Sequence, residues 1–170
     1  MNNAAFTIFI TSVRPKLYRF SLSLLKQQDA AEDVVQEVGL RLWKDVTKGS
    51  IHPHMEALAM CTAKNLCIDL LRKNSRQTRH WAEKAVAGTG ASLERTPQLI
   101  LEEKDTYAFI RKLIDRLPEQ QQMCIRLRDV EGYELDEVAR ILECDEGSVR
   151  ANLSRARKKI REQISQLWNR

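Results

Sequence analysis

The sequence lacks the long apolar runs and the leader pattern that carry chains into or across membranes. No apolar run reaches the length of a membrane span, and the first residues lack the basic, apolar and small-residue succession of a signal peptide. We therefore expect a soluble, cytoplasmic protein. Sustained alternation of apolar and polar residues is also absent, so we predict an all-α fold.

Patterns that indicate a bound metal or catalysis are missing as well. The four cysteines show no C-x-x-C pairing, and no cysteine or carboxylate stands at ligand spacing from His52 and His54. Cys61, Cys67 and Cys124 lie in apolar helical segments, where we expect reduced, buried thiols. Since there is also no glycine-rich phosphate loop, we predict no metal, no cofactor and no enzymatic activity.

Positive charge is concentrated near the C-terminus. The chain has a formal net charge of +5, which allows a polyanionic partner without requiring one. From Arg150 to Arg161 there are six basic residues and no acidic one. We therefore expect this end of the chain to point toward phosphate.

Two apolar stripes in the same part of the chain predict a helix-turn-helix. The first runs from Leu135 to Leu142 at spacings of three and four, and the second runs from Val149 to Ile160. Between them, Asp145 is placed to cap the second helix by accepting from its free backbone N–H groups. Two short amphipathic helices across such a turn are typical of DNA-binding proteins.

The face opposite the second stripe alternates small residues with long hydrogen-bond donors. This pattern suits a helix in a major groove, where base edges and phosphates are both within reach. The alternative is a solvated basic helix of a bundle. The candidate DNA-contacting residues are Ser148, Arg150, Ala151, Asn152, Ser154, Arg155 and Lys158.

Three further helices are expected in the N-terminal half. Apolar spacing predicts them over residues 5–27, 30–46 and 55–73, with Pro15 marking a kink or a restart and Asp29 as a candidate cap. The residues expected to be buried are Ala31, Val34, Val35, Val38 and Leu42 in the second helix, and Leu58, Ala59, Thr62, Leu66 and Leu70 in the third.

One stretch has the composition of a linker. Residues 86–98 are small, polar and contain glycine and proline. Helical pattern resumes after them, and Pro118 stands in the first turn of another helix. We therefore predict two small helical domains, residues 1–82 and 105–170, joined by a linker over 83–104.

Motifs in both halves resemble one family. Asp33-Val-Val-Gln36-Glu37 and Asn65-Leu-Cys-Ile-Asp69-Leu-Leu-Arg72-Lys73 look like region 2 of the sigma-70 family. Leu117-Pro118-Glu119, Asp129-Val-Glu-Gly132-Tyr133 and the helix-turn-helix look like region 4. Because only these two regions are present with a short join, the chain is similar to extracytoplasmic-function (group IV) sigma factors.

The resemblance implies a function and a set of partners. It implies binding to the β′ clamp helices and the β flap of core RNA polymerase, recognition of promoter −10 and −35 elements, transcription initiation, and an anti-sigma factor. The positions expected to dock on polymerase are Asp33, Gln36, Glu37, Arg41 and Trp43. The positions expected at the −10 element are Lys64, Asn65, Arg72, Lys73 and Arg76, and those expected at the −35 element are the seven already named.

The chemistry of these positions suits the implied roles. Asp33, Gln36 and Glu37 follow one side of a helix away from its apolar stripe, as a polar strip for a basic partner would. An asparagine such as Asn65 offers both a donor and an acceptor to a base edge. Neighbouring Lys and Arg side chains hold a displaced strand by its phosphates.

The chain also departs from the family at three places. The loop over residues 48–56 carries no aromatic where the family often has one, and Asn152 stands where Arg is common. Glu143 lies in a turn where many such motifs have Gly, and a left-handed conformation there would cost about 1 kcal/mol. The base preference therefore does not follow from the resemblance.

Three other functions compete with this interpretation. An ordinary transcriptional regulator would explain the C-terminal half but leaves the motifs around Asp33 and Asn65 without a role. A metal-dependent nuclease would use Asp33, Glu37 and Asp69 as ligands, yet no nucleophile accompanies them. For a protein-interaction adaptor that never touches DNA, alanine at Arg150 and Arg155 would leave promoter affinity and its salt dependence unchanged.

Overall fold

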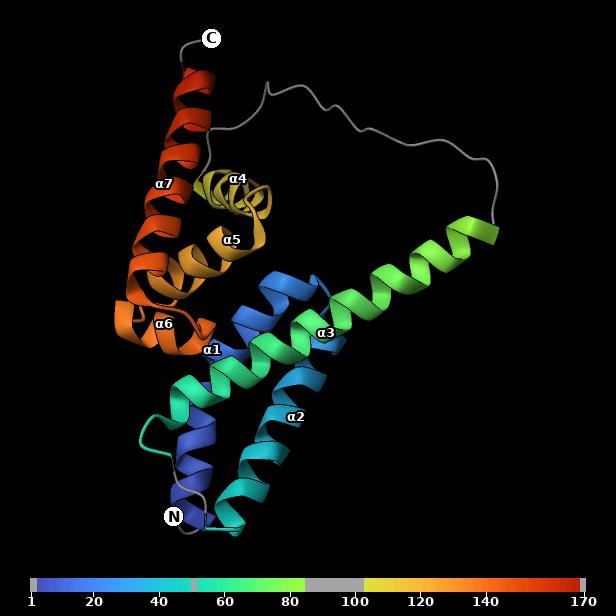
Figure 1. Cartoon of the computed structure of the whole chain (residues 1–170), viewed down its shortest axis with the longest axis vertical. Coiled ribbons are helices and arrows are strands. Elements are labelled where there is room, and N and C mark those ends of the chain that lie inside the picture. Colours follow the sequence, from blue (N-terminus) through green and yellow to red (C-terminus); the bar gives the residue numbers. More distant parts are fainter. Residues whose placement is uncertain (1–2, 50–51, 85–102, 169–170) are drawn as a thin grey trace.

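The computed structural model describes residues 3–49, 52–84 and 103–168, which contain helices and turns but no strand (Figure 1). In chain order the elements are α1 (Asn3–Leu25), α2 (Gln28–Thr47), α3 (Met55–Lys84), α4 (Glu103–Asp115), α5 (Glu119–Ile125), the π-helical turn η1 (Arg126–Val130), α6 (Leu135–Leu142) and α7 (Glu146–Trp168). The predicted all-α fold is confirmed. Residues 85–102, which make up most of the predicted linker, lie outside the described residues.

The N-terminal half packs α1, α2 and α3 around an apolar core. Leu17 and Phe20 of α1, Leu42 of α2 and Met60 of α3 are almost wholly buried. All five residues of the stripe predicted for the second helix are buried, so that prediction is confirmed.

Two local predictions in this half need correction. α1 continues through Pro15 as one helix, so Pro15 does not mark a restart. The packing of Val13 and Leu17 on either side outweighs the single lost backbone bond. Asp29 does not cap α2, since the helix already begins at Gln28 and has no side-chain cap. Asp29 instead lies in the first turn, where its charge still favours the helix dipole.

The stripe predicted for the third helix is correct only for Ala59. The other four residues are half-buried, namely Leu58, Thr62, Leu66 and Leu70. The side chains of α3 that are buried instead include Met60, Ala63 and Cys67. The reason is that α3 packs against α6 as well as against α1 and α2, so its most buried side lies between these neighbours.

Two of the cysteines behave as the sequence suggests. Cys67 of α3 and Cys124 of α5 are buried as predicted, whereas Cys61, which was also predicted to be buried, is only half-buried. Burial raises the pKa of the Cys67 and Cys124 thiols to about 11. Both thiols therefore stay protonated and unreactive at neutral pH.

The C-terminal half places α4, α5 and α6 against α7. Val138 and Leu142 are buried on α6, and Val149 and Leu153 are buried on α7. Asp145 caps α7 by accepting the backbone N–H of Ser148 at 2.8 Å. The predicted helix-turn-helix and its cap are confirmed.

Two backbone features shape the turns on either side of α6. Glu143 ends α6 in the left-handed conformation, with φ 56° and ψ 45°, which confirms the conformation anticipated at this position. Before α6, η1 widens the end of the preceding helix, because the N–H of Glu131 bonds to the carbonyl of Arg126, five residues back. Gly132 then takes φ +81° and turns the chain.

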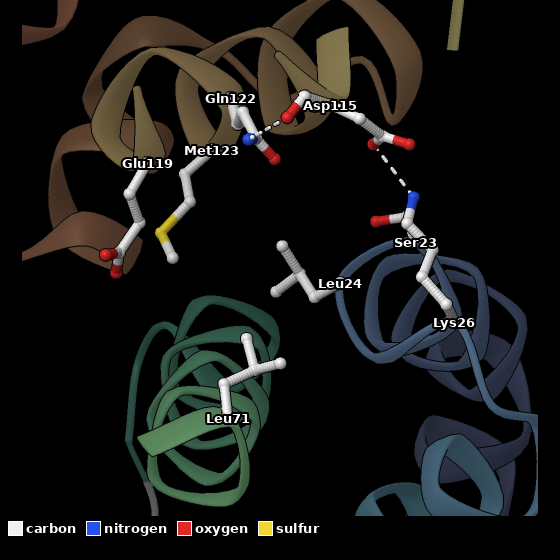
Figure 2. Close-up of a pocket in the computed structure, with 8 residues that line it drawn as sticks. All are labelled: Ser23, Leu24, Lys26, Leu71, Asp115, Glu119, Gln122 and Met123. Atoms are coloured by element: carbon white, nitrogen blue, oxygen red, sulfur yellow. Dashed lines mark hydrogen bonds and ion pairs between the residues drawn. The ribbon is translucent and has the colours of Figure 1, made fainter. Parts of the chain in front are cut away.

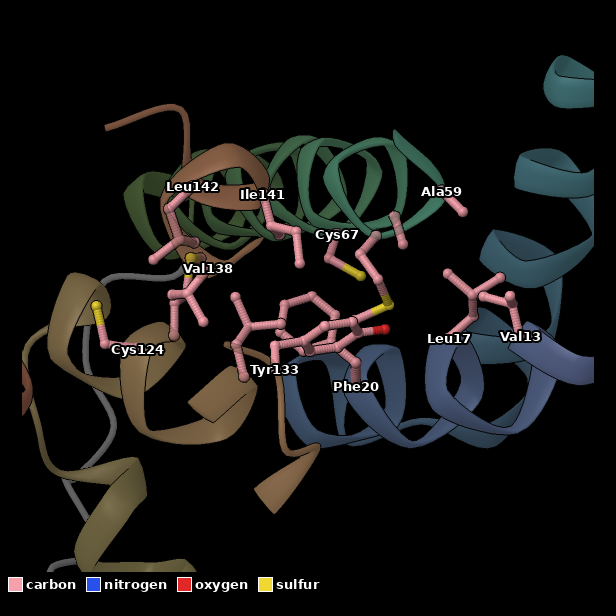
Figure 3. Close-up of a cluster of buried hydrophobic side chains, with 14 of the residues drawn as sticks. Val13, Leu17, Phe20, Ala59, Cys67, Cys124, Tyr133, Val138, Ile141 and Leu142 are labelled. Atoms are coloured by element: carbon pink, nitrogen blue, oxygen red, sulfur yellow. The ribbon is translucent and has the colours of Figure 1, made fainter. Parts of the chain in front are cut away.

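The two halves share one apolar cluster. Figure 3 shows it running from Val13 and Leu17 of α1 to Ile141 and Leu142 of α6, with Tyr133 between them. Each half therefore completes its core partly with side chains of the other. We call this contact, between α1 and α3 on one side and residues 115–143 on the other, the inter-domain seam.

Candidate nucleic-acid interface

α7 presents the predicted DNA-contacting face outward. Val149, Leu153 and Ala156 are buried on its opposite side, so helical periodicity turns the remaining positions toward solvent. Four of the seven predicted residues are exposed, namely Arg150, Ser154, Arg155 and Lys158. The other three are half-buried, namely Ser148, Ala151 and Asn152.

Several of these side chains already have partners within the helix. The Ser148 hydroxyl donates to Asp145 Oδ2 at 2.7 Å, which with the backbone bond keeps the pKa of Asp145 below its usual value. Asn152 Nδ2 donates to the Ser148 carbonyl at 3.0 Å. Arg150 pairs with Glu146 at 3.1 Å. Arg155 has no ion pair within the described part of the chain, which leaves its guanidinium available for an outside acceptor.

One arginine of the basic run serves a different purpose. Arg157 makes a two-point contact with Asp129, with Nη2 2.6 Å from Oδ1 and Nε 3.0 Å from Oδ2. The hydrogen bonds to Asp129 raise the pKa of Arg157. This pair ties α7 to η1, so Arg157 fixes the orientation of the helix. The count of charges in the sequence gives no sign of this role.

The predicted −10 residues separate into two groups along α3. The exposed ones are Asn65, Arg72, Lys73 and Arg76. The Lys64 side chain is only 7% exposed, and its Nζ lies 2.8 Å from Oε2 of Glu143. The hydrogen bond from Lys64 lowers the pKa of Glu143, and Cys61 and Asn65 add to this effect. The turn of the helix-turn-helix thus sits directly against the start of this group.

The predicted polymerase-docking strip is open on α2. Asp33 and Gln36 are exposed, and Arg41 pairs with Glu37 one turn away at 2.7 Å. Leu40, which the sequence analysis did not select, is 56% exposed at the middle of this strip. An exposed leucine between hydrogen-bonding side chains is typical of a surface that a partner covers.

Trp43 occupies a more sheltered place at the edge of this strip. It is half-buried, and its ring packs against Phe6 of α1 with the ring centres 5.0 Å apart. A tryptophan held in this way keeps part of its surface for a partner at little further cost in side-chain entropy.

Besides the Lys64–Glu143 pair, two further ion pairs between distant parts of the chain hold the inter-domain seam. Arg19 of α1 makes a two-point contact with Glu131 at 2.6 and 3.2 Å, and the Glu131 side chain is only 3% exposed. Lys26 follows α1 with φ 58°, and its Nζ lies 2.8 Å from Asp115.

A tyrosine anchors the middle of the seam. The hydroxyl of Tyr133 donates to Glu56 Oε1 at 2.7 Å, and Lys16 Nζ lies 2.7 Å from the same oxygen and 4.8 Å from the centre of the Tyr133 ring. Burial alone would raise the pKa of Glu56, but the hydrogen bonds from Lys16 and Tyr133 lower it. Burial, followed by the bond to Glu56, raises the pKa of Tyr133. Sequence reasoning missed these contacts because single charges far apart along the chain leave no periodic signal.

A cavity of about 320 Å³ opens at the seam (Figure 2). Leu24 of α1, Leu71 of α3 and Met123 of α5 line it, and the Lys26–Asp115 pair lies beside it. None of the predicted site residues lines this cavity. Among the described residues, no three His, Cys, Asp or Glu side chains gather as a metal site. In the same ranges, no helix has the length and apolar character needed to span a membrane.

Comparisons with known proteins agree with this arrangement. Residues 9–77 match the model for Sigma-70 region 2 and residues 110–160 match the model for Sigma-70, region 4. The chain is 27% identical over 144 residues to the ECF RNA polymerase sigma-E factor of Escherichia coli (strain K12), which covers 81% of this chain and 75% of that protein.

Two solved structures share the fold over nearly their whole length. One is the sigma factor RpoE in complex with the anti-sigma factor NepR from Bartonella quintana, with a TM-score of 0.72 and 23% identity over 95% of this chain and 97% of that one. The other is CnrH in complex with the cytosolic domain of CnrY, with a TM-score of 0.69 and 18% identity over 97% of this chain and 90% of that one.

Fold and matches together define a two-region helical transcription factor with a helix-turn-helix. More specifically, the chain belongs to the sigma-70 family of RNA polymerase sigma factors, in its extracytoplasmic-function group.

Proposed function

We propose that this protein is an extracytoplasmic-function sigma factor that binds core RNA polymerase, recognises promoter −10 and −35 elements and directs transcription initiation. The observation that carries the proposal is the presence of both family regions in one chain, with the α2 strip and the α7 face both exposed. The protein itself catalyses nothing, because the polymerase supplies the chemistry. We therefore assign the protein to the cytoplasm, where the polymerase acts.

Polymerase docking is assigned to the α2 strip. Asp33, Gln36 and Glu37, with Arg41 beside them, offer exposed hydrogen-bonding groups to the β′ clamp helices. The half-buried ring of Trp43 adds an aromatic anchor at the edge of the contact. The α7 half meets the β flap.

Promoter recognition is divided between α3 and α7. On α3, Asn65 reads a base that has left the stack, while Lys64, Arg72, Lys73 and Arg76 hold the phosphates of the unpaired strand. On α7, Arg155 and Lys158 reach base edges or phosphates in the major groove, and Ser148, Arg150, Ala151, Asn152 and Ser154 form the surface around them. The match of these motif positions to the two family regions supports the proposed roles, and so does the exposure of Asn65, Arg72, Lys73 and Arg76 on α3 and of Arg150, Ser154, Arg155 and Lys158 on α7.

The two halves act together on the polymerase. We take them to be residues 1–82 and 105–170, with 83–104 as the connection. Each carries only a few phosphate contacts, so the free protein should bind duplex promoter weakly. Holding both halves on one enzyme makes recognition bivalent.

An anti-sigma factor is the expected regulator. One structural neighbour is a sigma factor in complex with an anti-sigma factor, and the other is CnrH in complex with the cytosolic domain of CnrY. The cavity at the seam, which apolar and polar side chains line together, and the exposed Leu40 offer such a partner surfaces that the free chain leaves uncovered.

In vitro transcription from a genomic library with core polymerase tests the proposed function. Addition of the protein should create new start sites with a shared −10 and −35 sequence. A protein that binds promoter fragments as a dimer, and leaves the start sites of core polymerase unchanged, would be an ordinary regulator.

A charge reversal on α2 tests the docking surface separately. Glu37→Lys should weaken binding to core polymerase by about tenfold, because it places a cation against a basic partner. The matched control is Asp136→Lys on α6, which makes the same charge change outside the strip. Equal losses in both variants would contradict the assignment of the strip.

A further inference from the structure

Glu143 holds a strained position at the seam. Among the described residues, only Lys26 and Glu143 have a positive φ without being glycine, and both of them form an ion pair across the seam. Glycine would take the conformation of Glu143 without a steric penalty. Non-glycine residues that keep such a conformation are concentrated at functional sites, so the contact of Glu143 is a candidate for a functional role.

The side chain of Glu143 occupies the first part of the proposed −10 surface. Its carboxylate lies 2.8 Å from Lys64 Nζ, the most deeply buried amine of that surface. Asn65, the proposed base-reading residue, and Cys61 lie near enough to stabilise the same carboxylate in its ionised form. The Glu143 side chain is itself 63% exposed, so it lies over these groups from the solvent side.

A carboxylate is chemically similar to what this surface is proposed to bind. It brings a negative charge for an ammonium group, as a phosphate does, and acceptor oxygens for an amide, as a base edge does. An unpaired DNA strand and Glu143 therefore cannot use Lys64 at the same time.

The remaining proposed surfaces are not covered in this way. Arg155 on α7 and Gln36 on α2 are exposed, and so are Arg72 and Lys73 farther along α3. Among the described residues proposed for the −10 surface, only Lys64 is buried, and the residue that covers it lies in the turn between the two helices of the helix-turn-helix.

We propose that Glu143 is an intramolecular plug, which occupies the Lys64–Asn65 end of the −10 surface until α6 moves away from α3. This inference rests on the proposed function, because it assigns regulation to the same surface. The seam contacts of Arg19, Lys26 and Tyr133 hold the plug in place. Docking on polymerase through the exposed α2 strip can precede its release.

Removal of the plug in the full-length protein tests the proposal. Glu143→Gln keeps the size of the side chain and removes its charge, while Glu143→Gly also relieves the backbone strain. The control is Asp136→Asn on the same helix, a carboxylate whose one ion pair among the described residues is with Arg140 of α6. Two measurements are made on each protein.

The first measurement is the rate of Lys64 acetylation, followed by mass spectrometry. Lys64 should react at least about fivefold faster in both Glu143 variants than in the original protein or in Asp136→Asn. This readout requires neither DNA nor polymerase. Unchanged reactivity in both variants overturns the plug, whatever the outcome of transcription assays.

The second measurement is affinity for a fluorescein-labelled 20-nucleotide single strand of mixed sequence. Both Glu143 variants should bind about fivefold more tightly, and adding Lys64→Ala to Glu143→Gln should abolish the gain. If Lys64 becomes reactive but affinity stays the same, the contact exists without competing with DNA, and the proposal is wrong. Failure of the proposed function appears elsewhere, as absent binding to core polymerase.

Discussion

The two proposed nucleic-acid-binding faces, on α7 and on α3, differ in the contacts that determine their accessibility. The α7 face is built by contacts within its own half, since Asp145 caps the helix and Arg157 ties it to Asp129 of η1. The start of the α3 face depends on a residue far along the chain, because Glu143 covers Lys64. A face made from local contacts stays open in any domain arrangement. A face closed from the other half responds to how the halves meet, and the arrangement of domains becomes a means of control.

Disrupting the inter-domain seam at Tyr133 should produce the largest loss of stability among the predicted changes. Tyr133→Ala removes a buried ring and its bond to Glu56, so it should lower the free energy of unfolding by about 3–5 kcal/mol. Urea denaturation measures the loss. Tyr133→Phe is the matched control, and losing only the hydroxyl should cost about 1 kcal/mol. Similar costs for the two variants would show that burial of the ring contributes little.

Mutation of the exposed α7 face should weaken promoter binding without changing the stability of the protein. Arg155→Ala should weaken binding of the polymerase complex to a promoter duplex by about 1–3 kcal/mol. It should also reduce the slope of log K against log salt by about 1 if Arg155 contacts a phosphate. Lys48→Ala, an exposed cation beyond the end of α2, is the control and should have no effect. A drop in melting temperature for Arg155→Ala would show that this face is not independent of the core.

Glycine substitutions should separate turn geometry from helix propensity. Gly132 has φ +81° and open space around it, so Gly132→Ala should cost about 1 kcal/mol through backbone strain alone and loosen the approach to Tyr133. Gly39 lies within α2, where an added Cβ would meet Ile10 at an ordinary 3.8 Å. Gly39→Ala should therefore stabilise the protein by about 0.5–1 kcal/mol. Thermal melts of both variants compare the two effects, and a stabilising Gly132→Ala would contradict the turn geometry.

Acid should weaken the contacts that cover the start of the α3 face before it affects the α7 face. This change in stability should be the smallest of the predicted effects. Folding lowers the pKa of Glu56 and Glu143 from 4.5, so their contribution to stability is complete above about pH 4.5 and is lost as the pH falls through their lower folded values. Urea midpoints should be flat from about pH 7 to 5.5 and decline below 4.5. Glu143→Gln should show a shallower decline than the original protein, whereas Arg155→Ala should follow the original curve.

The sequence predicts those features that neighbours determine. The stripe from Ala31 to Leu42 is periodic because one partner surface covers it, and it is found buried as predicted. The cap at Asp145 and the left-handed Glu143 depend on a few residues of local backbone. These are the places where pattern and propensity act without competition.

Features that depend on the meeting of the halves were not predictable in this way. The face of α3 that is buried differs from its apolar stripe because α6 packs against α3 in addition to α1 and α2. Lys64 is charged and stands among residues expected to meet DNA, so nothing local indicates that its side chain is buried beneath Glu143. The pairs made by Arg19 and Tyr133 span 112 and 77 positions along the chain. Single residues at such separations carry no repeat that a sequence pattern can reveal.

The wide turn at η1 gives the length of the chain a direct structural meaning. Its bond from Glu131 to Arg126 accommodates one residue more than an ordinary α-helical turn. Each residue of a helix advances the chain by about 100° of rotation. Deleting one residue from η1 would therefore swing Glu131 and Tyr133 away from α1 by more than a quarter of a circle while leaving every side chain chemically intact. At η1, the number of residues determines the relative orientation of the two halves as much as the residue types do.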